Sequence, residues 1–61
     1  MGMTLAARQH WVLGRDAFER GRYDEAAGRL EQAIALAPEF PDLHNLLGLA
    51  LGVSGERERA A

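Results

Sequence analysis

His10 and His44 are the side chains of this chain best suited to acid–base chemistry or metal binding. A metal site on a helix needs a second ligand three or four residues from the first, so that both project from one face. Leucine and glycine occupy those two positions after each histidine, and the chain has no cysteine. We therefore expect packed or solvated histidines, no metal and no cofactor.

The other polar residues form no catalytic arrangement. No nucleophile has a base at a suitable spacing, and the seven glycines are too scattered for a phosphate-binding loop. The run Glu56-Arg57-Glu58-Arg59 is typical of a solvated chain end. The sequence therefore indicates a protein without enzymatic activity.

The apolar residues recur with helical periodicity, which predicts that helices carry these side chains. The sequence has no alternating run of β-branched residues that would predict a strand. The first helix is expected to follow the N-cap residue Thr4 and to run to about Arg20, where Gly21 can adopt the left-handed conformation that ends a helix. The apolar stripe that it should turn toward a partner helix consists of Leu5, Val12, Leu13 and Ala17.

A second helix is expected to begin near Tyr23 and to stop before Pro38, because proline disfavours helical geometry in the preceding residue. Pro41 suits the first turn of a third helix, which should run to about Val53. Ser54-Gly55 is expected to end that helix, and the remaining residues should open a fourth.

The sequence matches itself at a shift of 34 residues, a period that indicates a helical repeat. The identical pairs are His10/His44, Leu13/Leu47, Gly14/Gly48, Gly21/Gly55, Ala26/Ala60 and Ala27/Ala61.

One segment resembles the tetratricopeptide (TPR) consensus at the expected spacings. The residues that carry the resemblance are Leu13-Gly14, Ala17, Gly21-Arg22-Tyr23-Asp24-Glu25-Ala26, Leu30, Ala33 and Pro38. It covers about residues 8–41 as a full repeat and 42–61 as a partial one. Two positions depart from the pattern, since the first-helix aromatic comes one place late, at Trp11, and Arg57 replaces the tyrosine of the second repeat.

The resemblance implies an all-α fold, an antiparallel helix-turn-helix hairpin followed by a third helix and a short fourth-helix stub. We expect the first repeat over residues 4–40 and the partial second repeat over 41–61. Residues 1–3 are expected to be vector-derived or disordered, because Met1-Gly2 looks like a start codon and spacer before a native Met3.

The resemblance also implies a scaffold fragment for protein–protein interaction, whose concave face binds a peptide or a partner helix. In this family the first helix of each repeat lines that face. The corresponding positions here are Arg8, Trp11, Arg15, Asp42, Asn45 and Leu49. Two arginines beside a tryptophan suit a partner with acidic character. The competing interpretation is that Trp11 packs within the hairpin or against another copy.

The clamp with which some family members hold chaperone C-terminal carboxylates is not matched. Trp11, Arg15 and Leu46 stand where its first lysine and its asparagines would be.

Self-assembly is the alternative function, because fewer than three repeats bury little apolar surface. The apolar face of the third helix should remain open and invite a second copy to cover it, by swapping or by face-to-face packing. The residues expected there are Leu43, Leu47 and Leu51, with Ala50 beside them.

Charge and hydropathy narrow the class of partner. The net charge is -2 and the sequence pI is about 5.5, which argues against nucleic acid and against a DNA-binding helix-turn-helix. No apolar run approaches the roughly 18 residues of a membrane span, and the N-terminus has no secretory signal pattern. We expect a cytoplasmic protein with protein partners, although a targeting segment could be missing from a shortened chain.

Overall fold

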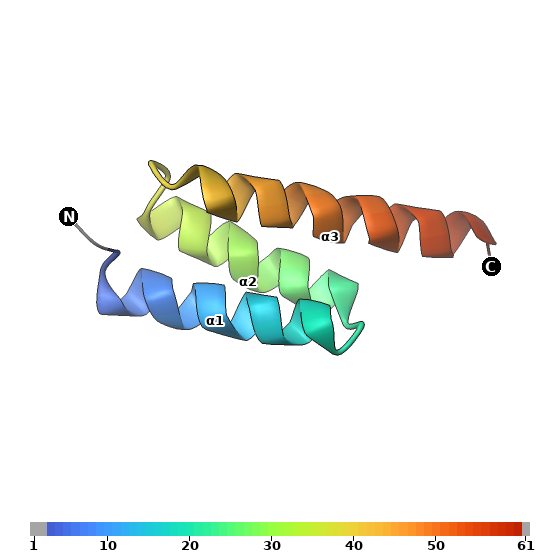
Figure 1. Cartoon of the computed structure of the whole chain (residues 1–61), viewed down its shortest axis with the longest axis horizontal. Helices are drawn as coiled ribbons and strands as arrows, with labels where there is room; N and C mark the ends of the chain where they lie inside the picture. The colour runs from blue at the N-terminus through green and yellow to red at the C-terminus, as the bar shows by residue number, and fades with distance from the viewer. Residues whose placement is uncertain (1–2, 61) are drawn as a thin grey trace.

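The computed structural model describes the backbone of residues 3–60 and the side chains of residues 3–56 and 59. Three helices follow one another: α1 (Leu5–Glu19), α2 (Tyr23–Leu36) and α3 (Pro41–Ala60). Each runs antiparallel to the one before, and α2 lies between α1 and α3 (Figure 1). No strand occurs in the described part of the chain, so the all-α prediction is confirmed.

The predicted helix ends of α1 are confirmed in detail. The Thr4 side-chain oxygen accepts a hydrogen bond from the Ala7 amide at 3.2 Å, as an N-cap does. At the other end Gly21 has a φ of +81°, and the Arg22 amide donates to the Ala17 carbonyl at 2.8 Å. This six-to-one bond and the left-handed glycine form a Schellman motif, which turns the chain back toward α2.

The link between α2 and α3 also follows the prediction. The Ala37 backbone leaves helical geometry directly before Pro38, and its amide still donates to the Ala33 carbonyl at 2.9 Å. Pro41 is the first residue of α3, where a missing N–H is of no consequence.

The predicted fourth-helix stub is wrong. Residues Ser54-Gly55 continue α3, which reaches Ala60 and extends past the α1–α2 turn (Figure 1). Among the described residues a positive φ occurs only at Gly21. A left-handed turn at Gly55 would break backbone hydrogen bonds of the helix, and only the packing of the following segment could offset that loss. A continuous helix keeps these hydrogen bonds.

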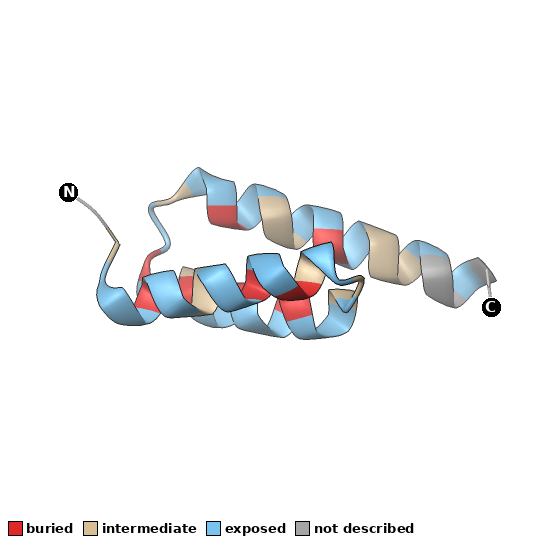
Figure 2. Ribbon diagram, turned by 60° about the horizontal axis from the view of Figure 1, so that its bottom comes forward, coloured by how far each residue is buried: buried red, intermediate tan, exposed pale blue. Residues whose placement is uncertain are grey.

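The core consists almost entirely of alanines. The buried residues lie on the sides of the helices that face one another (Figure 2). They are Ala7, Ala17, Ala26, Ala27, Leu30, Ala33, Ala37, Leu43 and Ala50. Such small side chains bring the helix backbones close together, so stability depends on close approach more than on buried volume.

At Gly14, α1 and α2 approach each other closely. A Cβ placed on Gly14 would lie 2.9 Å from Leu30 Cγ and 3.3 Å from the Ala26 carbonyl oxygen. The absence of a side chain at Gly14 therefore permits the two helices to approach each other closely. Tyr23 packs beside the turn, where its ring meets Phe18 edge-on at a centroid distance of 5.2 Å.

The predicted apolar stripe of α1 is wrong in three of its four members. Leu5, Val12 and Leu13 are 71%, 43% and 47% exposed, and only Ala17 is buried. The face that packs is instead formed by Ala7, Gly14 and Ala17, with partly buried Trp11 and Phe18 at its edge. The three exposed residues project from another side of α1 than Ala7, Gly14 and Ala17, so they do not reach the contact with α2.

Candidate partner-binding surface

Trp11 and Arg15 lie one helical turn apart on α1 and contact each other. The Arg15 guanidinium carbon sits 5.2 Å from the centre of the Trp11 ring, a cation–π arrangement. Trp11 is half-buried and packs against the core cluster, while Arg15 is exposed. The indole thus packs within the hairpin, as the competing interpretation expects, and its role in partner binding stays a prediction.

The exposed arginines of α1 differ in their partners. Arg20 Nε lies 3.1 Å from Asp16 Oδ2, and this is the one ion pair among the residues described. Arg8 and Arg15 have no carboxylate partner within the described chain. Their charge is therefore available to a ligand, although solvent screens it.

The three candidate residues of α3 are all exposed, and Leu49 has 59% of its surface accessible. Within the described residues, no hydrogen bond or ion pair links Asp42, Asn45 or Leu49 to the α1 candidates. α1 packs mainly on α2 and barely meets α3. The structure therefore brings Trp11 and Arg15 together and leaves the two groups of candidates without direct interaction.

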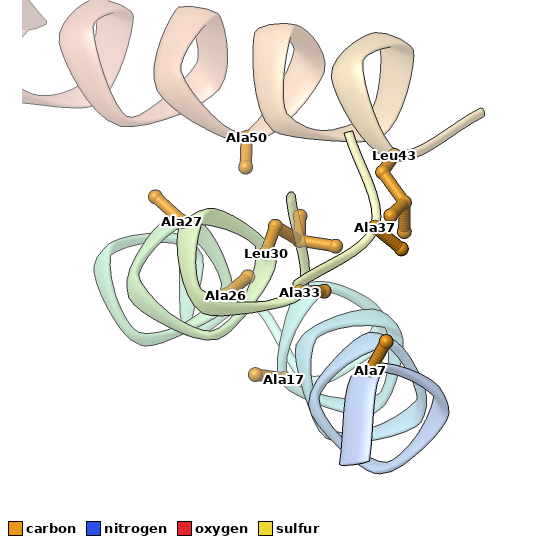
Figure 3. Packing of buried hydrophobic residues seen from close by; sticks show 9 residues of the cluster. All are labelled: Ala7, Ala17, Ala26, Ala27, Leu30, Ala33, Ala37, Leu43 and Ala50. Atoms are coloured by element: carbon orange, nitrogen blue, oxygen red, sulfur yellow. The ribbon is translucent and has the colours of Figure 1, made fainter. Parts of the chain in front are cut away.

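The predicted self-association residues have unequal exposure. Leu43 is wholly buried, and it lies beside Ala37 in Figure 3. Leu47 is partly buried against the core, whereas Leu51 is 51% exposed. Figure 3 shows Ala50 pointing from α3 toward Ala27 of α2. The prediction of an open face at Leu43 and Ala50 is wrong, because α2 already covers them.

The sequence interpretation missed a hollow on the exposed side of α1. Its lining is mainly apolar and consists of Leu5, Arg8, Gln9, Val12 and Leu13, called here the outer face of α1. Periodicity had grouped three of these residues, but it had assigned them to a helix contact. The exposed fractions of Leu5, Val12 and Leu13 show that they face solvent instead.

The two histidines lie in different surroundings. His44 Nε2 lies 3.3 Å from the Pro38 carbonyl oxygen, next to the α2–α3 link. The Nδ1 atom of half-buried His10 is inaccessible and has no hydrogen-bond partner. No group of three or more metal-binding side chains gathers in the described part of the chain.

A side-chain contact joins the first turn of α2 to the second half of α3. The Ser54 hydroxyl, in the helix segment where a turn was predicted, donates a hydrogen bond to the Asp24 carboxylate. It ties α3 to the first turn of α2, where Asp24 follows Tyr23. This side-chain bond was not predicted, since nothing in the sequence relates two polar residues thirty positions apart.

Antiparallel helices joined by short turns, with glycine and alanine at the crossings, define an α-helical hairpin repeat. A sequence profile of the TPR repeat matches residues 14–55, from the middle of α1 to the second half of α3. The chain belongs to the TPR repeat family. TPR repeats are in general modules for protein–protein interaction and are typically not catalytic.

No curated protein and no solved structure gives a significant match to the chain. None of the described helices has the length and apolarity to span a membrane.

Proposed function

We propose that this chain binds a peptide or a partner helix of acidic character through Arg8, Trp11 and Arg15, together with Asp42, Asn45 and Leu49. The observation that carries the proposal is the Trp11–Arg15 pair. The half-buried indole packs against the core cluster, and the guanidinium of Arg15 lies over it without a carboxylate partner among the described residues. A packed aromatic beside an available arginine is a typical anchor for a protein ligand.

The α3 residues add different chemistry to the same proposal. Leu49 offers an exposed aliphatic side chain, and Asn45 can donate and accept hydrogen bonds to a ligand backbone. Asp42 lies in the first turn of α3 and would favour a ligand whose charge is not uniformly negative there. The partner is therefore expected to carry its acidic residues on the side that meets α1.

A selection from a displayed peptide library tests this proposal. Selected peptides should be enriched in Asp and Glu, and binding should change the fluorescence of Trp11, the one tryptophan of the chain. Arg15→Ala should weaken binding about tenfold, and Arg29→Ala, a charge loss on α2, should not. Peptides without acidic enrichment, or equal losses from both variants, would contradict it.

Self-assembly is the second candidate, and the exposed leucines of α3 favour it. Leu49 and Leu51 are both more than half exposed on a helix that extends past the hairpin. Neighbouring Gly48 and Gly52 have no atoms within 4 Å of a built Cβ, so another helix could approach closely there. We propose that a second copy covers this part of α3, with Leu51 at its centre.

Light scattering during size exclusion tests the second candidate. A dimer of the 6.7 kDa chain that Leu51→Asp converts to a folded monomer would support it. Leu36→Asp, a similarly exposed leucine on α2, is the matched control and should leave the dimer intact. A monomeric chain with a cooperative thermal transition would exclude self-assembly.

A further inference from the structure

We propose that the outer face of α1 is a second contact for the same ligand, and that it takes an aliphatic side chain lying next to a carboxylate in an acidic, extended peptide. This inference rests on the proposed function, because Arg8 belongs both to the candidate partner-binding residues and to the hollow. The ligand would pass from Trp11 and Arg15 over the edge of α1.

The internal repeat shows why a peptide fits this face better than a packed helix. At the equivalent positions 34 residues later, α3 buries Leu43 and Ala50 against α2. α1 carries Gln9 and Asp16 at those two positions, and Asp16 is paired with Arg20. A close-packed helix would have to bury Gln9 and the Asp16–Arg20 ion pair away from water, which is unfavourable.

At two neighbouring positions of this face, α1 nevertheless carries apolar residues, as α3 does. Val12 and Leu13 correspond to Leu46 and Leu47, which are partly buried on α3. On α1 both are exposed, and together with Leu5 they surround the hollow. A single inserted side chain could cover them and leave Asp16 hydrated, as an extended segment does and a helix does not.

Charge identifies the kind of peptide. Arg8 lies at the hollow, and Arg15 lies two turns further along α1, over the Trp11 ring. Neither arginine has a carboxylate partner among the described residues. An aliphatic residue seated between Leu5 and Val12 would place a neighbouring carboxylate within reach of Arg8. A basic peptide would meet two unpaired arginines and be repelled.

NMR titration of the full chain, labelled with nitrogen-15, tests this inference. The probe is a short amidated peptide in which two leucines flank a pair of aspartates. The control peptide has lysines in place of the aspartates. We expect amide shifts at residues 5, 8, 9, 12 and 13 with the acidic peptide alone. Leu5→Ser and Val12→Ser, both at exposed positions, should raise the Kd about tenfold, while Leu36→Ser should not.

Each other outcome has a defined meaning. Shifts limited to residues 11, 15, 42, 45 and 49 would overturn the outer-face contact and leave the proposed function standing. Shifts limited to the outer face would support this inference and count against the proposed function. Equal binding of the lysine peptide, or no binding of the acidic one at millimolar concentration, would overturn the inference.

Discussion

Gly14 and Gly48 are equivalent residues of the repeat in different surroundings. A Cβ on Gly14 would press on Leu30 and on the Ala26 carbonyl, whereas a Cβ on Gly48 would have no atom within 4 Å. The sequence made these two glycines look alike. Their difference comes from α2, which packs against Gly14, whereas no described atom lies close to Gly48.

Gly14→Ala should therefore destabilise the chain by about 1–3 kcal/mol, because the overlap with buried Leu30 outweighs the gain in helix propensity. Gly48→Ala, its control, should stabilise by up to about 1 kcal/mol. Urea unfolding followed by circular dichroism measures both. Changes of the same sign would show that Gly14 is not in a close helix contact.

Arg15→Ala should alter Trp11 directly, since the guanidinium lies over the indole ring. We expect the emission of the folded protein to shift, with a stability loss below about 1 kcal/mol, as for an exposed cation–π pair. Arg29→Ala is the control and should leave the emission spectrum unchanged. An unshifted spectrum in Arg15→Ala would mean that the pair is not populated in solution.

At the scale of helices, sequence reasoning located the elements better than their faces. Caps and breakers act locally, so Thr4, Gly21 and Pro38 fixed helix ends that the structure confirms. The packing face of α1 depends on how closely α2 approaches, which is a tertiary property. A search for large apolar residues therefore selected Leu5 and Val12, although the contact uses alanine and glycine.

The candidate site was likewise predicted only in part. The repeat register supplied Trp11 and Arg15 as neighbours one turn apart, and the structure shows their contact. It could not supply the hollow beside Arg8, because that hollow exists only when Leu13 and its neighbours face solvent. The binding role of these residues stays a prediction.

Gly21→Ala and Gly55→Ala distinguish a turn from a continuous α3. Gly21 has a φ of +81°, so an alanine there should cost about 1–2 kcal/mol. Gly55 lies within α3 with free space around it, so alanine should stabilise by up to about 1 kcal/mol. Thermal unfolding compares the two. A loss of stability in Gly55→Ala would restore the predicted turn and the fourth helix.

On the scale of the whole molecule, the fold is thin. Its Cα atoms extend over 42 × 18 × 14 Å, whereas the Cα atoms of one helix lie on a cylinder about 4.6 Å across, so the shortest dimension corresponds to about two helices side by side. Few positions can be covered from every side, and among the residues with described side chains only Leu30 and Leu43 are large and fully buried. Chains of this size bury about 60% of their unfolded surface and are correspondingly marginal.

Leu30→Ala should accordingly unfold the chain. Loss of a buried leucine costs about 2–5 kcal/mol, comparable to the whole stability of a small domain. Leu36→Ala changes an exposed leucine of the same helix and should alter stability by less than about 0.5 kcal/mol. Far-UV circular dichroism at 25 °C compares them, and a helical spectrum for Leu30→Ala would show that the core is more robust than its composition suggests.

The alanine core also determines how this chain responds to random mutation. At a buried alanine such as Ala26 or Ala33, every replacement except glycine adds atoms. Among the fully buried residues that the structure describes, truncation would leave a large cavity at Leu30 and Leu43 alone, although cavities are the usual result of core mutation in larger proteins. Most inactivating variants should therefore be too bulky, and a second substitution that shortens a side chain on the facing helix should rescue them.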